Sequence, residues 1–178
     1  RRIRDEMMKI LMSPGPAKGF YLMRKTGLLK QFLPELDECY LKRQNSCHKY
    51  TIFKHTMVCV ESVRPDPIVR LAALFHDIAK PFVREKIKGE FRFYHHEKAG
   101  ALMAKDIMQR LKFSGKSIRK VFHLISFHMI GYESSWSDSA VRRFIRKIGI
   151  ENMDDLMSLR RADLIAHGIM DNKIEKIR

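Results

Sequence analysis

Residues 74–80 read LFHDIAK, and they place His76 and Asp77 side by side after an apolar, helix-like lead-in. The surrounding apolar residues predict burial, and an ionised carboxylate is very costly to bury without a partner. A buried histidine also needs hydrogen-bond partners. Another residue or a metal ion must therefore pair with these two side chains. We predict a helix over residues 67–79, which Pro81 ends.

Helical periodicity dominates the rest of the chain. Apolar residues at helical spacing predict further helices over residues 3–11, 51–63, 96–112, 115–130, 138–148 and 152–167, with shorter helical pieces before residue 40. Residues 83–94 alternate around Lys88-Gly89 and predict a small hairpin. We therefore expect an all-α helical bundle with one small β-hairpin. A polar loop near residues 40–48 separates an expected helical connector, 1–45, from a main domain, 46–178.

The chain is strongly basic. It has 178 residues, 35 of them Lys or Arg and 20 Asp or Glu, which gives a formal net charge of +15. A charge of this size favours a polyanionic partner, most often nucleic acid. The chain contains no apolar run long enough to span a membrane, so we expect no membrane contact. It begins without a methionine, and we expect a piece of a longer protein.

The cysteines indicate the redox environment. Cys39, Cys47 and Cys59 form no CxxC pair and no zinc-finger spacing. A sparse, odd set argues against a disulfide framework and for a reducing compartment. We therefore expect a cytoplasmic protein.

Six polar residues fall on otherwise apolar faces of five predicted helices: His55, His76, Asp77, His96, His128 and Asp163. A single such histidine is more often a core residue that is hydrogen-bonded to backbone, but six together favour a shared site. Imidazole and carboxylate ligands suit a divalent transition metal, namely Mn, Ni, Co, Fe or Zn, with Mg as a further alternative. The sequence leaves open whether one or two ions bind.

The order His55, His76-Asp77, Asp163 resembles that of the HD superfamily of metal-dependent phosphohydrolases. In this resemblance, His96 and His128 match the two extra histidines of members that hold two metals. Four other histidines leave alternatives open. His123 is a rival for the second of these positions and His95 for the first, whereas surface or supporting roles are expected for His48 and His167.

The resemblance implies metal-assisted hydrolysis of a phosphate ester. Asp77 is expected to hold the water molecule that the ion activates. Lys80, one turn after His76, is expected to contact the phosphate of the substrate as a point charge. The alternative role for Lys80 is to bind the last carbonyl groups at the C-terminus of its helix.

Three longer stretches resemble a narrower family, the bacterial class II tRNA nucleotidyltransferases and poly(A) polymerases. Residues 2–36 resemble the segment that follows the nucleotidyltransferase domain in that family. Some members carry an HD domain behind that segment. It resembles HKYTIFKHT (48–56) with RLAALFHDIAKP (70–81), and its end resembles residues 135–168, which begin SWSDSAVRRFIRKIGI. The resemblance implies that this chain is the C-terminal part of such a protein.

The chain also departs from that family. The Gly-Ser and paired aspartates of the polymerase head do not occur, so we expect no nucleotide addition by this chain. Ala79 replaces a glycine often found after His-Asp-Ile, and His95 replaces one often found before the matching His96. Every expected metal position is nevertheless filled, which favours a working site.

Two groups of basic residues are expected to bind RNA, with tRNA as the favoured form. In the family, the N-terminal segment helps to hold the acceptor arm of tRNA. The expected contacts are Arg4, Lys18, Arg24, Lys25, Arg142, Arg143 and Arg146. For any single one of them, a solvated helix face is the simpler interpretation.

The expected function is hydrolysis of phosphomonoesters or 2′,3′-cyclic phosphates on nucleotides or RNA ends. The main alternative is a non-catalytic helical module that binds RNA or tRNA and whose HD residues are structural. A further alternative is a stand-alone nucleotide hydrolase.

Overall fold

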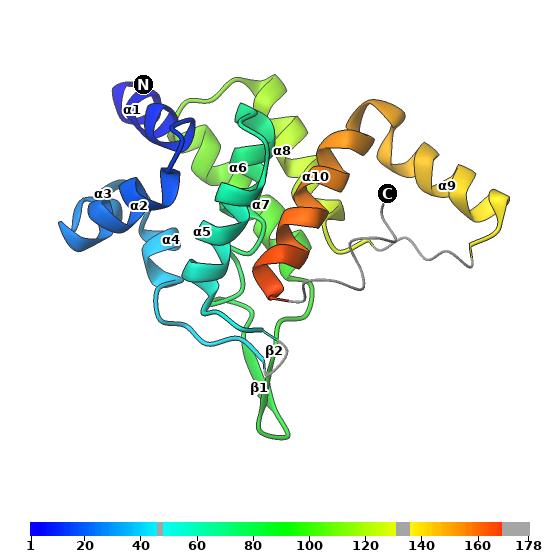
Figure 1. The fold of residues 1–178 in the computed structure, drawn as a ribbon, viewed down its shortest axis with the longest axis horizontal. Helices are drawn as coiled ribbons and strands as arrows, with labels where there is room; N and C mark the ends of the chain where they lie inside the picture. The colour runs from blue at the N-terminus through cyan, green and yellow to red at the C-terminus, as the bar shows by residue number, and fades with distance from the viewer. Residues whose placement is uncertain (46–47, 131–135, 169–178) are drawn as a thin grey trace.

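The structure is a computed structural model, and it describes residues 1–45, 48–130 and 136–168. Its helices are α1 (Arg2–Leu11), α2 (Pro16–Lys25), α3 (Leu28–Phe32), α4 (Pro34–Glu38), α5 (Ile52–Ser62), α6 (Pro67–Phe75), α7 (His96–Arg110), α8 (Gly115–Phe127), α9 (Asp138–Ile148) and α10 (Ile150–His167). Strands β1 (Glu85–Ile87) and β2 (Glu90–Arg92) lie between α6 and α7. The predicted all-α fold with one β-hairpin is confirmed (Figure 1).

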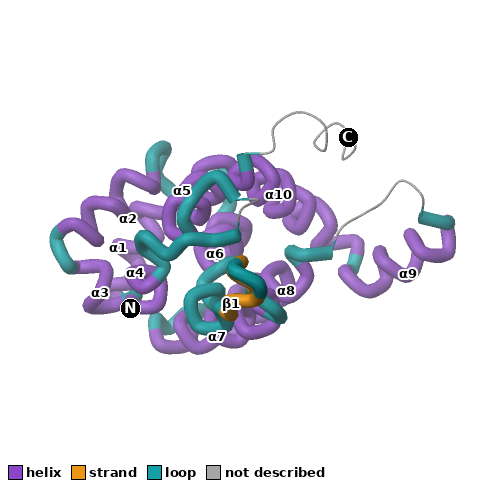
Figure 2. Tube along the Cα trace, turned by 90° about the horizontal axis from the view of Figure 1, so that it is seen from below, coloured by secondary structure: helices purple, strands orange, loops and turns teal. Residues whose placement is uncertain are grey.

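Helix α6 lies at the centre of the bundle and packs against α5, α7, α8 and α10. Helices α1–α4 gather at one end of the molecule, α9 extends at the other, and the hairpin projects from the bundle (Figures 1 and 2). All seven described helical residues from Val69 to Phe75 in α6 are buried. The apolar sequence of this helix is therefore explained by neighbours on every side.

The HD stretch differs from the prediction at one point. Helix α6 ends at Phe75 rather than near residue 79, and residues 76–82 form successive turns. The amide of Ile78 donates to the carbonyl of Phe75 over 3.2 Å, and that of Lys80 donates to the carbonyl of Asp77 over 3.0 Å. Each of these bonds spans three residues rather than the four of an α-helix, so the chain has left the α-helix before it reaches Pro81. His76 and Asp77 thus lie at the end of the buried helix, not within it.

Helix α7 lies close against this turn. A Cβ atom added at Gly100 would lie 3.2 Å from the backbone oxygen of His76, tighter than most real Cβ contacts. Glycine at this position lets α7 approach the end of α6. This approach brings the start of α7 to the residues that follow Phe75.

Local signals place most of the remaining boundaries. In the hairpin, Lys88 and Gly89 both have positive φ, 50° and 85°, as a two-residue type I′ turn requires. The hydroxyl of Ser137 accepts from the amide of Ala140 at the start of α9, as predicted. Gly149 and Gly168 follow the ends of α9 and α10, whereas the predicted cap Gly131 lies outside the described residues.

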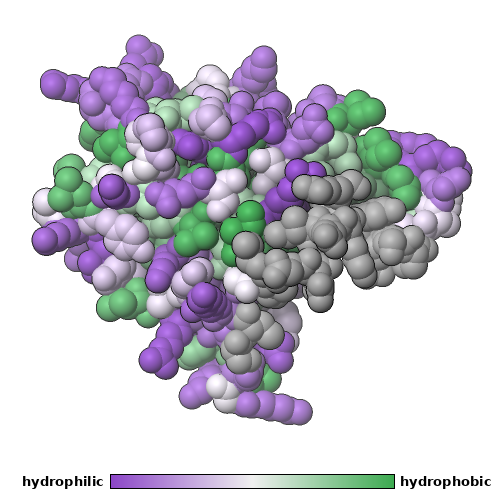
Figure 3. Space-filling model, in the orientation of Figure 1, coloured by the Kyte–Doolittle hydropathy of each residue, from purple (hydrophilic) through white to green (hydrophobic). Residues whose placement is uncertain are grey.

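Cys39 and Cys59 are buried and free, and Cys47 lies outside the described residues. Within the part of the chain that is described, no helix is long and apolar enough to cross a membrane. The face seen in Figure 1 is mostly hydrophilic, with hydrophobic side chains in small, separate patches (Figure 3).

Arg70 joins α1 to the bundle. Its guanidinium is buried in α6 and donates to the carbonyl oxygens of Leu11, over 2.6 Å, and Ser13, over 2.8 Å. Carbonyl groups at a helix C-terminus lack hydrogen-bond donors within the helix, and Arg70 supplies a donor to them.

We expect Arg70→Met to lower the free energy of unfolding by about 2–3 kcal/mol, because two buried carbonyls lose a charged donor. Urea denaturation monitored by circular dichroism measures this change. Arg2→Met removes an equal charge from an exposed position of α1 and serves as the control. An equal, small effect of both variants would contradict the proposed anchoring role.

Candidate metal centre

Three segments bring four predicted ligands together in the core. His55 comes from α5, His76 and Asp77 from the turn after α6, and Asp163 from α10. The Nε2 atom of His55 lies 3.1 Å from Oδ1 of Asp163 and 3.2 Å from Nε2 of His76. All four side chains are at most 4% exposed. The structure therefore places the predicted quartet in one buried cluster.

Asp77 is the centre of this cluster. Its Oδ2 atom lies 3.4 Å from Nε2 of His55 and 3.3 Å from Nε2 of His76. Its Oδ1 atom faces two other histidines, with Nε2 of His96 at 3.5 Å and Nε2 of His128 at 3.9 Å. The two oxygens of one carboxylate thus serve two different pairs of imidazoles.

Backbone carbonyls orient three of the histidines. Nδ1 of each ring donates to a carbonyl oxygen three residues earlier: His76 to Ala73 (2.8 Å), His96 to Phe93 (2.8 Å) and His128 to Ile125 (2.7 Å). A proton on Nδ1 leaves the lone pair on Nε2, the atom that faces Asp77. Metal-binding histidines are commonly oriented in this way.

The donor set fits a divalent cation. Buried polar atoms usually have hydrogen-bond partners, yet Nε2 of His96 and Nδ1 of His55 are buried without one. Among the described residues, three groups have ligand atoms within 4.8 Å of one another: His55, His76 and Asp77; Asp77, His96 and His128; His55, Asp163 and His167. Imidazole nitrogen with carboxylate oxygen is a ligand combination typical of Mn, Fe, Co, Ni or Zn.

Electrostatics keep both carboxylates ionised. Burial raises the pKa of Asp77, but His76 and Lys80 outweigh burial and hold that pKa well below its usual value. Burial also opposes ionisation of Asp163, and hydrogen bonds from His167 and His55 hold its pKa well below the usual value. Both side chains therefore carry the negative charge that a cation requires.

Most of the imidazoles are kept neutral. Burial lowers the pKa of His128 to about 3, and it also lowers the pKa values of His55 and His96. His76 differs, because Asp77 outweighs burial and raises its pKa. A metal ion would replace a proton at this position, since metal binding requires the neutral ring.

The structure separates the alternative histidines from the cluster. Nε2 of His123 donates to the carbonyl of Ile148 over 2.7 Å, so this ring is directed to the end of α9. His95 is exposed, with 77% of its side chain accessible. Neither belongs to the three groups of ligand atoms found among the described residues.

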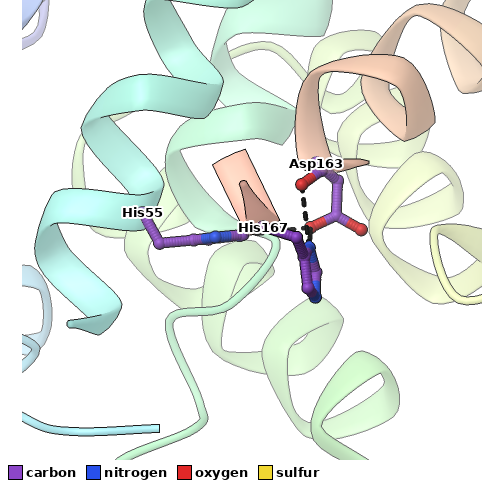
Figure 4. Close-up of side chains that lie close together, drawn as sticks. All are labelled: His55, Asp163 and His167. Atoms are coloured by element: carbon purple, nitrogen blue, oxygen red, sulfur yellow. Dashed lines mark hydrogen bonds and ion pairs between the residues drawn. The ribbon is translucent and has the colours of Figure 1, made fainter. Parts of the chain in front are cut away.

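His167 lies at the cluster, although the sequence suggested only a surface or supporting place. Its Nδ1 donates to the backbone oxygen of Asp163 over 2.8 Å and lies 3.3 Å from Oδ1 of the same residue (Figure 4). The ring of His48 lies against it, with centroids 4.1 Å apart and the ring planes tilted by 40°. Its spacing of four residues from Asp163 is a signal in the sequence that could have indicated this contact.

Lys80 is also part of the cluster. Its ammonium donates to Oδ2 of Asp77 over 2.6 Å and to Oε1 of Gln44 over 2.7 Å. Lys80 therefore binds two side chains, and not the carbonyl groups at a helix end that one of the two alternatives predicted for it. Contact with a substrate stays a prediction. Gln44 gave no signal in the sequence because its segment reads as a polar loop.

The predicted RNA contacts form two separate groups. Lys18 and Lys25 on α2 are exposed, whereas Arg24 lies 3.7 Å from Asp37 and stacks over the ring of Tyr40. Arg4 pairs with Asp5. On α9, Arg142, Arg143 and Arg146 are all exposed. The two groups lie at opposite ends of the molecule (Figure 1).

Sequence comparisons agree with this geometry. Residues 59–167, more than half of the chain, match the family described as HD domain. Residues 1–40 match the family described as the probable RNA and SrmB-binding site of polymerase A. His55 and Gln44 precede the HD match, and it is the fold that brings them to the cluster.

Individual relatives cover most of the chain. The A-adding tRNA nucleotidyltransferase of Deinococcus radiodurans is 34% identical over 169 residues, which is 91% of this chain and 38% of that protein. The CC-adding tRNA nucleotidyltransferase of Thermus thermophilus is 34% identical over 173 residues, which is 93% of this chain and 39% of that protein. The bifunctional uridylyltransferase/uridylyl-removing enzyme of Streptomyces coelicolor is 25% identical over 181 residues, 93% of this chain and 20% of that protein.

The chain therefore spans about two fifths of the length of the two tRNA nucleotidyltransferases. Its match to the HD description includes the turn after α6, which carries His76 and Asp77, and helices α7, α8 and α10. On these grounds the chain belongs to the HD-domain family and is homologous, over most of its length, to part of the tRNA nucleotidyltransferases.

Proposed function

We propose that this chain is a metal-dependent phosphohydrolase, of the phosphatase or 2′,3′-cyclic phosphodiesterase type, that acts on nucleotides or RNA ends. The observation that carries this proposal is the position of Asp77, whose two oxygens face two different pairs of buried imidazoles. A structural aspartate needs one partner, whereas a carboxylate between two sets of metal-binding atoms suits a hydrolytic centre.

Two ion positions follow from these contacts. A first ion would be held by His55, His76, Asp163 and Oδ2 of Asp77. A second ion would be held by His96, His128 and Oδ1 of Asp77. The donors suit Mn, Ni, Co, Fe or Zn, with Mg as an alternative. A divalent ion bound there lowers the pKa of water and stabilises charge on the phosphoryl oxygens.

The residues of the chain orient these groups and exclude bulk solvent. The ligands are buried, and three of the imidazoles are fixed by backbone carbonyls. In the reaction, the oxygen of water bonds to phosphorus, the bond from phosphorus to the leaving oxygen breaks, and that oxygen gains a proton. Side chains that are already held in place favour this in-line displacement because little reorganisation is needed.

We further propose that the chain is the HD-containing part of a tRNA nucleotidyltransferase or poly(A) polymerase-like protein and that it binds RNA, with tRNA favoured. Residues 1–45 would serve as the RNA-binding connector and residues 46–178 as the hydrolase domain. The match of residues 1–40 to an RNA-binding family, the names of the relatives and the charge of +15 support this proposal.

The same observations favour the second candidate, a non-catalytic RNA-binding module in which the HD residues are structural. A stand-alone nucleotide hydrolase is the third candidate. A screen of phosphomonoesters and 2′,3′-cyclic nucleotides with Mn²⁺, Ni²⁺, Co²⁺ and Mg²⁺ separates the first candidate from the second. Absence of hydrolysis in a metal-loaded protein that binds tRNA would support the module.

Metal binding should also stabilise the fold. We expect Mn²⁺, Ni²⁺ or Co²⁺ at about a hundred times its dissociation constant to add about 2.7 kcal/mol to the free energy of unfolding, because the ligands converge only in the folded state. Thermal melting of metal-stripped protein with and without each ion measures this gain.

His96→Gln should reduce the number of bound ions, whereas His95→Gln at the exposed neighbouring position should not. Equal metal content in both variants would contradict the second ion position.

A further inference from the structure

Each carboxylate of the metal centre has its own cation three residues away in the sequence. Lys80 Nζ lies 2.6 Å from Oδ2 of Asp77, and Arg160 Nη1 lies 2.8 Å from Oδ2 of Asp163. Both pairs compensate a buried negative charge. The two cations differ, however, in their burial and in the number of N–H donors that each carries.

Lys80 is held inside the protein. Its side chain is 5% exposed, and its ammonium donates to Asp77 and to Oε1 of Gln44. Gln44 is itself fixed, because its Nε2 donates to the carbonyl of Tyr50 over 3.2 Å. Two of the three ammonium protons are thus committed, and they orient Asp77.

Arg160 lies at the accessible side of the centre. It shares one face of α10 with Asp163 and His167, at positions i, i+3 and i+7. The side chains of Arg160 and His167 are 18% and 20% exposed, compared with 9% for His96 and at most 5% for the other metal-centre side chains. These two residues of α10 are therefore the most exposed side chains of the metal centre.

We infer that Arg160, rather than Lys80, binds the phosphate of the substrate, and this inference rests on the proposed phosphohydrolase function. A guanidinium has five N–H donors, and the ion pair with Asp163 uses one of them, so among the described residues others remain for a second anion. Its planar fork matches two phosphate oxygens at once, which an ammonium does not. Lys80 is in this assignment a positioning residue for Asp77.

The test measures two dissociation constants of the full chain. Equilibrium dialysis gives the constant for Mn²⁺, and calorimetric titration of the Mn²⁺-saturated protein gives the constant for inorganic phosphate. The variants are Arg160→Gln, which keeps a donor for Asp163, Arg160→Lys and Lys80→Met. Arg161→Gln is the control, because it removes the same charge from an exposed position of the same helix.

We expect Arg160→Gln to weaken phosphate binding at saturating Mn²⁺ on the order of ten- to a hundredfold, because the variant loses a charged hydrogen bond to phosphate. Arg160→Lys should restore part of it, and Arg161→Gln should match the parent. Lys80→Met should weaken Mn²⁺ binding and leave phosphate binding at saturating Mn²⁺ unchanged.

Unchanged phosphate binding in Arg160→Gln would overturn the inference, and so would a parent protein that binds no phosphate when loaded with Mn²⁺. If Lys80→Met alone loses phosphate binding, Lys80 is the contact and the assignment is wrong. Arg160-dependent phosphate binding in a protein that hydrolyses no phosphate ester would support the assignment of Arg160 and reject the proposed hydrolase function.

Discussion

Asp77→Ala should abolish hydrolysis of a 2′,3′-cyclic nucleotide, with a loss on the order of a thousandfold or more, comparable to the removal of a principal electrostatic group from an active site. The substitution removes one ligand from each proposed ion position at once, because each oxygen of Asp77 faces a different pair of histidines. Metal content should fall together with hydrolysis. Initial rates at saturating Mn²⁺ and metal analysis of the same samples measure both losses.

The control for this substitution is a second aspartate. Asp154→Ala changes an exposed carboxylate on α10 and should leave hydrolysis, metal content and fold unchanged. Because Asp77→Ala also leaves Lys80 buried without its carboxylate, circular dichroism must show equal helix content. Asp77→Asn, which keeps the shape of the side chain, provides a second variant if the alanine variant unfolds. Full hydrolysis by a folded Asp77→Ala protein would show that the metal assignment is wrong.

Binding of tRNA should be unchanged in Asp77→Ala, since the basic groups lie on other helices. Loss of hydrolysis with retained tRNA binding would therefore separate the catalytic centre from the RNA surface. Parallel loss of both in a folded variant would contradict this separation.

Replacing Arg142, Arg143 and Arg146 together by alanine should lower the salt dependence of tRNA binding by about 2–3 units in the slope of log K against log salt. Each phosphate contact contributes roughly 0.7–0.9 to that slope. At low salt the affinity should fall on the order of a hundredfold. Filter binding or fluorescence anisotropy over a series of salt concentrations measures the slope.

The structure favours α9 for this test. Its three arginines are exposed, while Phe144 and Ile148 on the opposite face are buried, so the substitution changes charge without touching the packed side. Alanine also has high helix propensity. Three exposed lysines on α7 and α8, replaced by alanine, provide a control of equal charge: Lys98, Lys105 and Lys116.

Helix α2 carries the competing basic surface. If the slope instead falls for a variant that lacks Lys18 and Lys25, the RNA surface lies on α2, at the opposite end of the molecule from α9 (Figure 1). An unchanged slope in both variants would contradict both proposed surfaces.

Helical periodicity in the sequence determined the main elements of this fold. The hydrophobic repeats predicted α5 and α7–α10 because a helix that buries one face must repeat its apolar residues at that spacing. The hairpin was equally readable, since Lys88-Gly89 supplies the two residues with positive φ that a tight turn needs. The six polar residues on apolar faces were also found from the sequence, because an uncompensated polar group in a core is costly.

Tertiary structure alone decided which groups meet in the cluster. Periodicity left His123 and His128 as rivals one turn apart, and only the packing of α8 turns His123 to Ile148 and His128 to Asp77. The apolar pattern also did not reveal the early end of α6, where turns with bonds over three residues replace the α-helix.

Gln44 and Arg160 reach the ligands through contacts that depend on the assembled bundle or on the direction of a side chain. The sequence by itself thus determined which residues had to find partners. The tertiary structure decided which partners they have, because a periodic pattern states that a face is buried and not what covers it.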